Sequence, residues 1–313
     1  METESVESAR RIRVPVAESV GLSVLAWRSD GSVEAAAPLV LFHGIASNAR
    51  TWDPVARILA GAGHDVFAVD FRGHGESDAP DGGYDLATFA SDLTAVTERL
   101  AGGRGDGAGY DSGDGRRARS VLIGHSLGAM TILEALKRAP DLAGGAGLVE
   151  GGLVDASVQF GSLDECLSRS QLPPVGGMPR ARVEGYLRAT NPGWNEERLA
   201  GTMAAFRTEQ DGTVQWRLTP PRFESLIRSM WEQRAPELWP FVAVPTLIVT
   251  ADTGDETWTE QKRVASESAE RALPRARVCR LTGDHDIHAD RPVEVADAIL
   301  AAFADGFFGG AES

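Results

Sequence analysis

Short apolar segments alternate with helical segments along most of this chain, and the alternation constrains the fold more than any other feature of the sequence. Most of the apolar segments are hydrophobic on both faces, as strands of a parallel sheet covered by helices must be. We predict strands at residues 38–42, 65–70, 120–124, 147–150, 245–250 and 277–281, preceded by a hairpin of residues 11–16 and 22–27.

Predicted helices lie between these strands, at residues 54–60, 86–100, 128–138 and 293–303. Strands that alternate with helices pair in parallel and are joined by right-handed crossovers. We therefore expect an α/β fold in which a mostly parallel sheet is flanked by helices.

Two segments interrupt the alternation. Residues 101–119 are rich in Gly and Asp and lack periodicity, so we expect a surface loop there. Residues 153–244 contain no clear parallel strand, but they hold four of the seven tryptophans and four helical stretches, 163–170, 180–189, 195–207 and 221–233. We predict that residues 153–240 form a helical cap and that residues 1–152 and 241–313 form the core.

The composition argues against several classes of partner. The chain has a formal net charge of −14, and such a field repels nucleic acids and anionic membranes. No apolar run is long enough to span a membrane, and the first residues lack the apolar region of a secretory signal. The two cysteines, Cys166 and Cys279, are too few for a disulfide framework. We expect a cytoplasmic protein without nucleic-acid or membrane partners.

The sharpest motif is Gly124-His125-Ser126-Leu127-Gly128, which follows a predicted strand and begins a predicted helix. A serine in such a turn is exposed above the end of the strand, and the turn tolerates little side-chain bulk two residues before or after it. The helix N-terminus also favours negative charge that develops nearby. We therefore predict that Ser126 is a nucleophile.

A second motif, His43-Gly44-Ile45, follows the strand at 38–42. We predict that the backbone N–H of Ile45, together with that of Leu127, forms an oxyanion hole for a tetrahedral intermediate. His43 itself is expected to have a structural role in holding this loop.

The third motif lies near the C-terminus, where His285 and His288 follow the last predicted strand. A serine hydroxyl is a weak nucleophile until a neighbouring base takes its proton, and an imidazole suits that task near neutral pH. His285 comes first after the strand and so can reach the sheet edge that carries Ser126. We predict that His285 is the general base, with His288 as the alternative.

Taken together, these segments resemble the α/β-hydrolase superfamily from about Val14 to Phe303. The matching stretches are LFHGIASNARTW, VFAVDFRGHGESD, VLIGHSLGAM, VPTLIVTAD and GDHDIHADRP. The last is similar to the family's Gly-x-His pattern with a proline seven residues after the histidine, which is the spacing from His285 to Pro292. The resemblance also implies that the loop at residues 70–77 is a structural turn.

The resemblance implies a catalytic carboxylate, and here the chain departs from the family pattern. The acid normally follows the strand at 245–250, where the usual position falls on Gly254. Asp255 lies one residue later, Glu150 ends the preceding strand as the acid does in some relatives, and Asp252 lies close to the strand end. We rank Asp255 first, Glu150 second and Asp252 third.

The resemblance further implies hydrolysis of an ester-type bond in a small-molecule acyl substrate through an acyl-enzyme. Carboxylesters, lactones and thioesters are all compatible with the shared core. Hydrolysis of a C–C bond in a diketone uses the same triad, and a ligand-binding protein without activity is the alternative from another class. The sequence contains no nucleotide-binding glycine motif and no Cys/His spacing for zinc, so we expect neither cofactor nor metal.

We predict that Ser126→Ala removes essentially all turnover and leaves the fold intact, because the turn accepts a smaller side chain. Hydrolysis of a p-nitrophenyl ester by the purified wild-type and variant proteins measures the effect, and circular dichroism checks the fold. Turnover near the wild-type level in the alanine variant would exclude Ser126 as the nucleophile.

Overall fold

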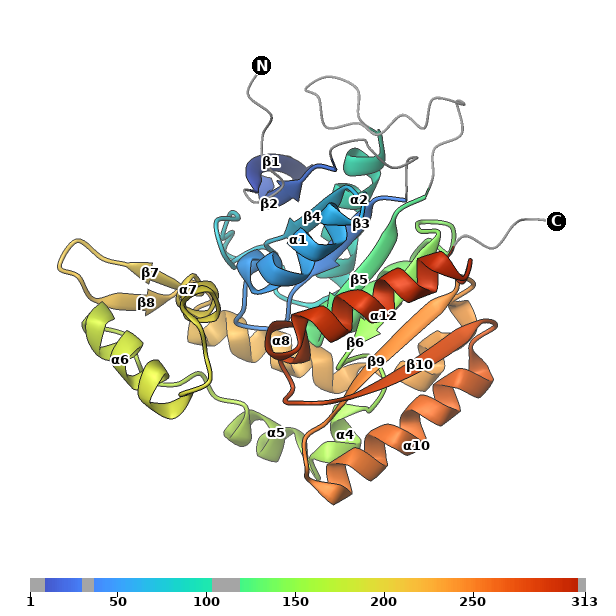
Figure 1. Ribbon diagram of the computed structural model, residues 1–313. Coiled ribbons are helices and arrows are strands. Elements are labelled where there is room, and N and C mark those ends of the chain that lie inside the picture. The colour runs from blue at the N-terminus through green and yellow to red at the C-terminus, as the bar shows by residue number, and fades with distance from the viewer. Residues whose placement is uncertain (1–8, 30–36, 103–118, 309–313) are drawn as a thin grey trace, which may run out of the picture.

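The structure, a computed structural model, describes residues 9–29, 37–102 and 119–308. Its centre is an eight-stranded sheet in the order β1-β2-β4-β3-β5-β6-β9-β10 (Figure 1). β2 pairs antiparallel with both β1 and β4, and the other neighbours pair in parallel. The strands are β1 (Arg10–Ala17), β2 (Val20–Trp27), β3 (Leu39–Phe42), β4 (Val66–Val69), β5 (Val121–His125), β6 (Gly145–Val149), β9 (Thr246–Asp252) and β10 (Ala276–Thr282).

Helices cover both faces of this sheet, so the predicted α/β fold is confirmed. α1 (Asp53–Gly61) and α12 (Pro292–Ala304) pack on one face, and α2 (Leu86–Gly102), α3 (Leu127–Arg138) and α10 (Glu256–Ala272) pack on the other. The central strands β3, β4 and β6 are apolar and buried at every position, because successive residues enter different cores. In β3, Leu41 packs toward α1 and α12, whereas Phe42 packs toward α2 and α3.

The helix α10 was not among the predicted helices. Its buried positions are only Lys262, Ser266 and Ala269, and most of its other residues are polar or charged. It therefore lacks the continuous apolar stripe by which a surface helix is usually recognised. Three short helical turns, η1 (Ala49–Trp52), α11 (Ile287–Asp290) and η2 (Trp239–Phe241), complete the connections.

The inserted segment, residues 153–240, lies between β6 and β9 and is mainly helical. It contains α4 (Ala156–Gln159), α5 (Leu163–Arg169), α6 (Arg180–Thr190), α7 (Glu196–Met203), α8 (Pro220–Glu232), α9 (Ala235–Leu238) and a hairpin of β7 (Phe206–Thr208) and β8 (Val214–Trp216). The helix expected to reach residue 207 ends at Met203. Phe206 and Val214 instead pack on α6 and α7 as paired strands, joined by a turn in which Gly212 has φ 80°.

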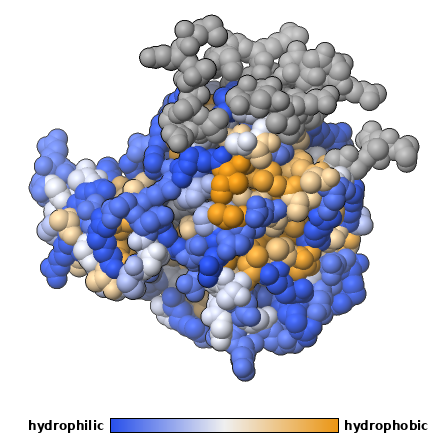
Figure 2. All heavy atoms as spheres, in the orientation of Figure 1, coloured by the Kyte–Doolittle hydropathy of each residue, from blue (hydrophilic) through white to orange (hydrophobic). Residues whose placement is uncertain are grey.

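Hydrogen bonds join the inserted segment to the rest of the chain. Asn48 Nδ2 donates to the Gly201 carbonyl at 2.9 Å, and Gln233 Nε2 donates to the Met130 carbonyl at 3.1 Å. The lobe of α6, α7, β7 and β8 extends to one side of the sheet (Figure 1). Its visible surface is mainly hydrophilic (Figure 2). The division into a core and a cap as separate domains stays a prediction.

The predicted surface loop and the absence of a predicted membrane span are two further expectations from the sequence. Most of the predicted loop at 101–119 lies outside the described residues, and α2 continues to Gly102. None of the helices that the structure describes is both long enough and apolar enough to span a bilayer.

The strand order reverses between β3 and β5. β4 lies beyond β3 on one side, whereas β6, β9 and β10 lie beyond β5 on the other. In open α/β sheets, ligands bind beyond the carboxyl ends of the strands at such a reversal. The candidate nucleophile Ser126, directly after β5, lies at this point.

A buried ion pair joins the turn after β4 to α2. Nε and Nη2 of Arg72 donate to the two carboxylate oxygens of Asp92 at 2.6 and 2.8 Å, and the side chains are 8% and 5% exposed. Asp92→Asn leaves the Arg72 charge buried without a counter-ion, so we expect the free energy of unfolding to fall by about 3 kcal/mol in urea denaturation. Glu134→Gln, which breaks the more exposed pair with Arg138, should cost less than about 1 kcal/mol. Equal losses would contradict this account.

Candidate active site

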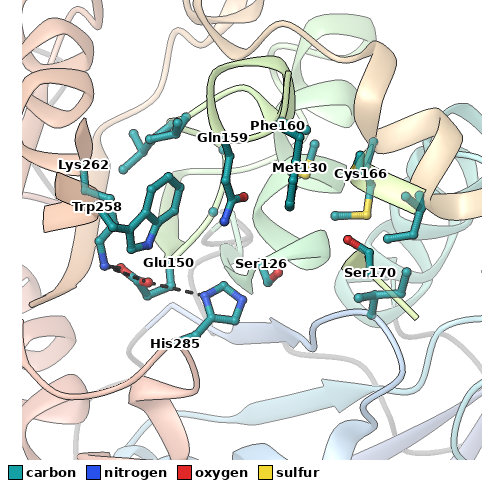
Figure 3. Close-up of a pocket in the computed structure, with 18 of the residues that line it drawn as sticks. Ser126, Met130, Glu150, Gln159, Phe160, Cys166, Ser170, Trp258, Lys262 and His285 are labelled. Carbon is teal, nitrogen blue, oxygen red and sulfur yellow. Dashed lines mark hydrogen bonds and ion pairs between the residues drawn. The ribbon is translucent and has the colours of Figure 1, made fainter. Parts of the chain in front are cut away.

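The predicted catalytic residues lie at one edge of the sheet, beyond the carboxyl ends of neighbouring strands. Ser126 follows β5, Glu150 follows β6, and His285 lies in the loop between β10 and α11. Ile45 lies in the loop after β3. Because parallel strands end at the same edge, these residues, far apart in the sequence, line a single cavity (Figure 3).

Ser126 occupies a strained turn between β5 and α3. Its backbone has φ 51° and ψ −112°, a conformation that residues other than glycine rarely adopt. A Cβ atom on Gly124 would lie 2.3 Å from the carbonyl carbon of Gly128, and a Cβ atom on Gly128 would lie 2.4 Å from the carbonyl oxygen of Phe42. The two glycines therefore permit the close approach of strand and helix that directs the Ser126 side chain into the cavity (Figure 3).

Ile45 and Leu127 carry the amides predicted to form an oxyanion hole. In the part of the chain that the structure describes, neither amide N–H donates to another protein group. Ile45 lines the same cavity as Ser126, and Leu127 is the first residue of α3, where the helix dipole is positive. Both donors are available, and their role as an oxyanion hole stays a prediction.

Two buried histidines fix the loop that follows β3. The Phe71 N–H donates to His43 Nε2 at 3.1 Å, so His43 Nδ1 carries the ring proton and donates to the Gly44 carbonyl at 2.7 Å. In the same way, the Ala46 N–H donates to His74 Nε2 at 3.3 Å. Burial lowers the pKa of His43 to about 4 and that of His74 to about 3, so both rings are neutral at neutral pH. These contacts fit a structural role for His43.

The ring of His285 lies between Ser126 and Glu150 (Figure 3). Its Nδ1 is 3.4 Å from Glu150 Oε2, and its side chain is 56% exposed, so Nε2 is free to face a substrate. Among the described residues no hydrogen bond joins His285 to Ser126, and in ligand-free enzymes such bonds often tighten only when a substrate binds. His125 Nε2 donates to the carbonyl of His285 at 2.9 Å and so anchors this loop beside the nucleophile turn.

His288, the alternative base, is not one of the described residues that line the cavity. It is 1% exposed, its ring packs on that of Trp52 with centroids 4.3 Å apart, and its Nε2 lies 3.2 Å from Thr51 Oγ1. Burial, together with the nearby His125, holds its pKa well below the usual value. The structure therefore places His285 at the candidate site and His288 in the interior.

The carboxylate beside His285 belongs to Glu150, so the ranking that placed Asp255 first is wrong as to geometry. Asp255 is exposed and caps the N-terminus of α10, where its Oδ1 accepts a hydrogen bond from the Trp258 N–H at 2.9 Å. An aspartate immediately before a helix is a preferred N-cap. The ranking failed because α10 was not recognised in the sequence.

Asp252, ranked third, forms hydrogen bonds within the turn between β9 and α10. Its Oδ1 accepts hydrogen bonds from the Gly254 N–H at 3.1 Å and from Thr259 Oγ1 at 3.0 Å. Its carboxylate is exposed at the end of β9, and its hydrogen bonds stabilise this turn. It has no described contact with His285.

Glu150 is buried and held by several donors. The Ala251 N–H donates to Oε1 at 2.6 Å, and Lys262 Nζ lies 3.2 Å from both carboxylate oxygens. Burial alone would raise the pKa of Glu150, but the hydrogen bonds from His285 and Ala251 and the charge of Lys262 lower that pKa below its usual value. The Glu150 carboxylate is therefore ionised at neutral pH.

The cavity over Ser126 has a volume of about 400 Å³ and lies between the sheet edge and the inserted segment. Helices α4, α5 and α8 contribute lining residues from the inserted segment, and α10 contributes Trp258 and Lys262. Most of the lining is apolar, and Gln159, Cys166 and Ser170 add uncharged polar groups (Figure 3). The apolar lining residues are Ile45, Met130, Leu153, Val154, Ala156, Phe160, Phe223, Ile227, Met230 and Trp258.

Two residues of the site were missed in the sequence. His125 stood in the motif without an assigned role, and Lys262 lay in the helix that was not recognised. A signal for Lys262 existed, because it is one of only two lysines among the 31 basic residues of the chain. Within the described ranges, no group of three or more His, Cys, Asp or Glu side chains is arranged to hold a metal ion.

Comparison with known proteins shows a family to which the chain is similar. A model of the alpha/beta hydrolase family matches residues 39–298. A 2-(acetamidomethylene)succinate hydrolase of Mesorhizobium japonicum is 36% identical over 124 residues, which are 39% of this chain and 37% of that protein. An esterase of Mycobacterium tuberculosis is 35% identical over 131 residues, which are 41% of this chain and 36% of that protein. The chain thus matches well under half of the length of these curated relatives.

The fold is shared over a much greater length. The crystal structure of an E-2-(acetamidomethylene)succinate hydrolase superposes with a TM-score of 0.72 and covers 95% of this chain and 99% of that chain. The sequence identity over this superposition is 22%, so the likeness concerns the fold alone.

The position of the carboxylate leads to a direct test. Glu150→Gln removes the charge that orients the imidazole, so we expect kcat for a p-nitrophenyl ester to fall on the order of a thousandfold. Asp255→Asn is the matched control, because Asn is as good an N-cap as Asp, and its kcat should stay within about twofold of wild type. A large loss in Asp255→Asn combined with a small loss in Glu150→Gln would reverse the assignment.

Proposed function

The chain belongs to the alpha/beta hydrolase family, and we propose that it is a serine hydrolase that cleaves an ester-type bond through an acyl-enzyme. The observation that carries the proposal is the convergence of Ser126, His285 and Glu150 on one cavity at the strand-order reversal. Family membership alone does not specify the reaction, which depends on the residues of the site.

The proposed reaction begins with attack of Ser126 Oγ on the substrate carbonyl carbon. The hydroxyl proton passes to His285 Nε2, and the carbonyl electron pair moves to the oxygen, which the amides of Ile45 and Leu127 stabilise. Collapse of the tetrahedral intermediate expels the alcohol or thiol, which takes the proton from the imidazolium. Water then attacks the acyl-enzyme by the same steps and releases the acid. Glu150 fixes the imidazole with Nδ1 protonated and stabilises its charge.

The cavity favours an uncharged and mainly apolar substrate. Among the described lining residues, Lys262 is the only lysine or arginine, and its ammonium group is bound to Glu150 and to the Ala251 carbonyl. No cation is therefore left for a substrate carboxylate, and burying an unpaired carboxylate among apolar side chains is costly. The name of one relative shows that it acts on a succinate derivative, and we propose that this chain differs in preferring uncharged acyl groups.

Labelling with a fluorophosphonate tests the proposed function. An activated serine forms a covalent bond to phosphorus and expels fluoride, so the wild-type protein should be labelled and Ser126→Ala should not. The site of the adduct is read by peptide mass spectrometry. A folded wild-type protein that is not labelled would favour the alternative, a ligand-binding protein without hydrolytic activity.

Substrate charge is tested with a matched pair of esters, p-nitrophenyl butyrate and p-nitrophenyl hemisuccinate, which differ mainly in a terminal carboxylate. We expect kcat/KM for the butyrate to exceed that for the hemisuccinate by about tenfold or more, because the cavity offers the carboxylate no counter-ion. Equal values, or a preference for the hemisuccinate, would contradict the predicted substrate class and leave the serine mechanism intact.

A further inference from the structure

We infer that Lys262 is a positioning residue for the proposed reaction, whose buried ammonium group keeps the Glu150 carboxylate charged and oriented toward His285. The inference rests on the proposed function, since it concerns the acid of the same triad. It concerns a residue of α10, the helix that no sequence motif identified. Lys262 acts through Glu150, and no role in contacting the reacting atoms is assigned to it.

The geometry of Lys262 is that of a fixed internal counter-ion. Its Nζ lies 3.2 Å from each oxygen of Glu150 and also donates to the Ala251 carbonyl. The side chains of Lys262 and Glu150 are 6% and 1% exposed, so water does not screen the pair. An ammonium group has three donors, and here three acceptor oxygens surround it.

Glu150 needs this cation because its two other donors leave its charge uncompensated. The Ala251 N–H is neutral, and His285 must also be neutral before the reaction so that it can accept the proton of Ser126. A buried carboxylate without a counter-ion tends to take up a proton. A protonated Glu150 would neither hold the Nδ1–H tautomer of His285 nor stabilise the imidazolium.

The contacts also orient the carboxylate. Ala251 and Lys262 both bind Oε1, while Oε2 is shared between Lys262 and His285. This arrangement fixes the carboxylate plane and directs one oxygen toward the base. Figure 3 shows the resulting row of side chains, with Lys262, Glu150 and His285 in succession beside Ser126.

The pH dependence distinguishes this role from packing alone. Among the residues that the structure describes, the charged or titratable groups around the pair are His285 from the loop after β10, His125 from the end of β5 and Asp252 from the end of β9. Removing the Lys262 charge favours protonation of Glu150, because the buried carboxylate then has no counter-ion. The form with protonated Glu150 is inactive, so the acid limb of the activity profile moves to higher pH.

The experiment measures kcat and KM for p-nitrophenyl butyrate between about pH 5 and pH 9. In Lys262→Met we expect the acid limb to move up by about one pH unit, which lowers kcat/KM about tenfold near pH 6 and less at high pH. The loss should lie mainly in kcat, because Lys262 acts on the base rather than on substrate binding. Lys262→Arg keeps the charge and should keep the wild-type acid limb.

Lys137→Met is the matched control for removing a lysine. Lys137, the other lysine of the chain, is exposed on α3, and the profile of this variant should coincide with that of wild type. An unchanged profile in Lys262→Met, or a loss of the same size at every pH, would overturn the positioning role.

A double variant keeps the test decisive if Lys262→Met does not fold. Glu150→Gln with Lys262→Met leaves neither partner charged, and its residual activity is compared with that of Glu150→Gln alone. We expect no further loss of kcat in the double variant, because Lys262 acts through the Glu150 charge, and a further loss of kcat would overturn the inference. A wild-type protein that fails to react with the fluorophosphonate would overturn the proposed function and this inference together.

Discussion

At the carboxyl ends of β3 and β5 and the start of α3, backbone atoms approach so closely that the glycines there could not be replaced by residues with a Cβ atom. A Cβ at Gly128 would meet the Phe42 carbonyl at 2.4 Å, and one at Gly151 would meet the Ser126 carbonyl at 2.5 Å. The Ser126 N–H donates to the Val149 carbonyl at 3.0 Å. Any movement of the nucleophile turn would therefore also move the end of β6, and with it the carboxylate that faces the base.

The same edge of the sheet concentrates the backbone strain of the molecule. Among the described residues, the non-glycine residues with positive φ are Ala46, Ser126 and Glu150, at 54°, 51° and 49°. They lie beyond the ends of β3, β5 and β6, which are neighbours in the sheet. Such conformations cost free energy and persist only where surrounding contacts enforce them. Here the enforcing contacts are hydrogen bonds of the three amides to the His74 ring, to the Val149 carbonyl at the end of β6 and to the Val249 carbonyl within β9.

Features that depend on local sequence were predictable, whereas features that depend on contacts between distant segments were not. The central strands β3, β4, β5 and β6 were predictable because both of their faces are buried. Ser126 was predictable because its turn has local steric requirements. The β7–β8 hairpin was not predictable in the same way, since its short strands are stabilised by packing on α6 and α7. Periodicity within three-residue strands carries little information.

The catalytic carboxylate shows most clearly what local sequence could not predict. Asp255 and Glu150 are both carboxylates after buried strands, and local sequence favours neither. The choice depends on where α10 begins, because that helix takes Asp255 as its cap and delivers Lys262 to Glu150. A prediction of the acid therefore required the position of a helix that has almost no apolar stripe.

The register of the sheet gives a physical reason why the ion pair lies where it does. β6 pairs with β9 as far as Val149 and Val249, and the Glu150 N–H continues this ladder to the Val249 carbonyl. The next backbone groups of β9 on that side, the N–H and the carbonyl of Ala251, extend beyond the end of β6. Glu150 Oε1 accepts from the N–H, and Lys262 Nζ donates to the carbonyl, so the ion pair replaces the missing strand. The site therefore obtains its charged carboxylate from an arrangement that also completes the edge of the sheet.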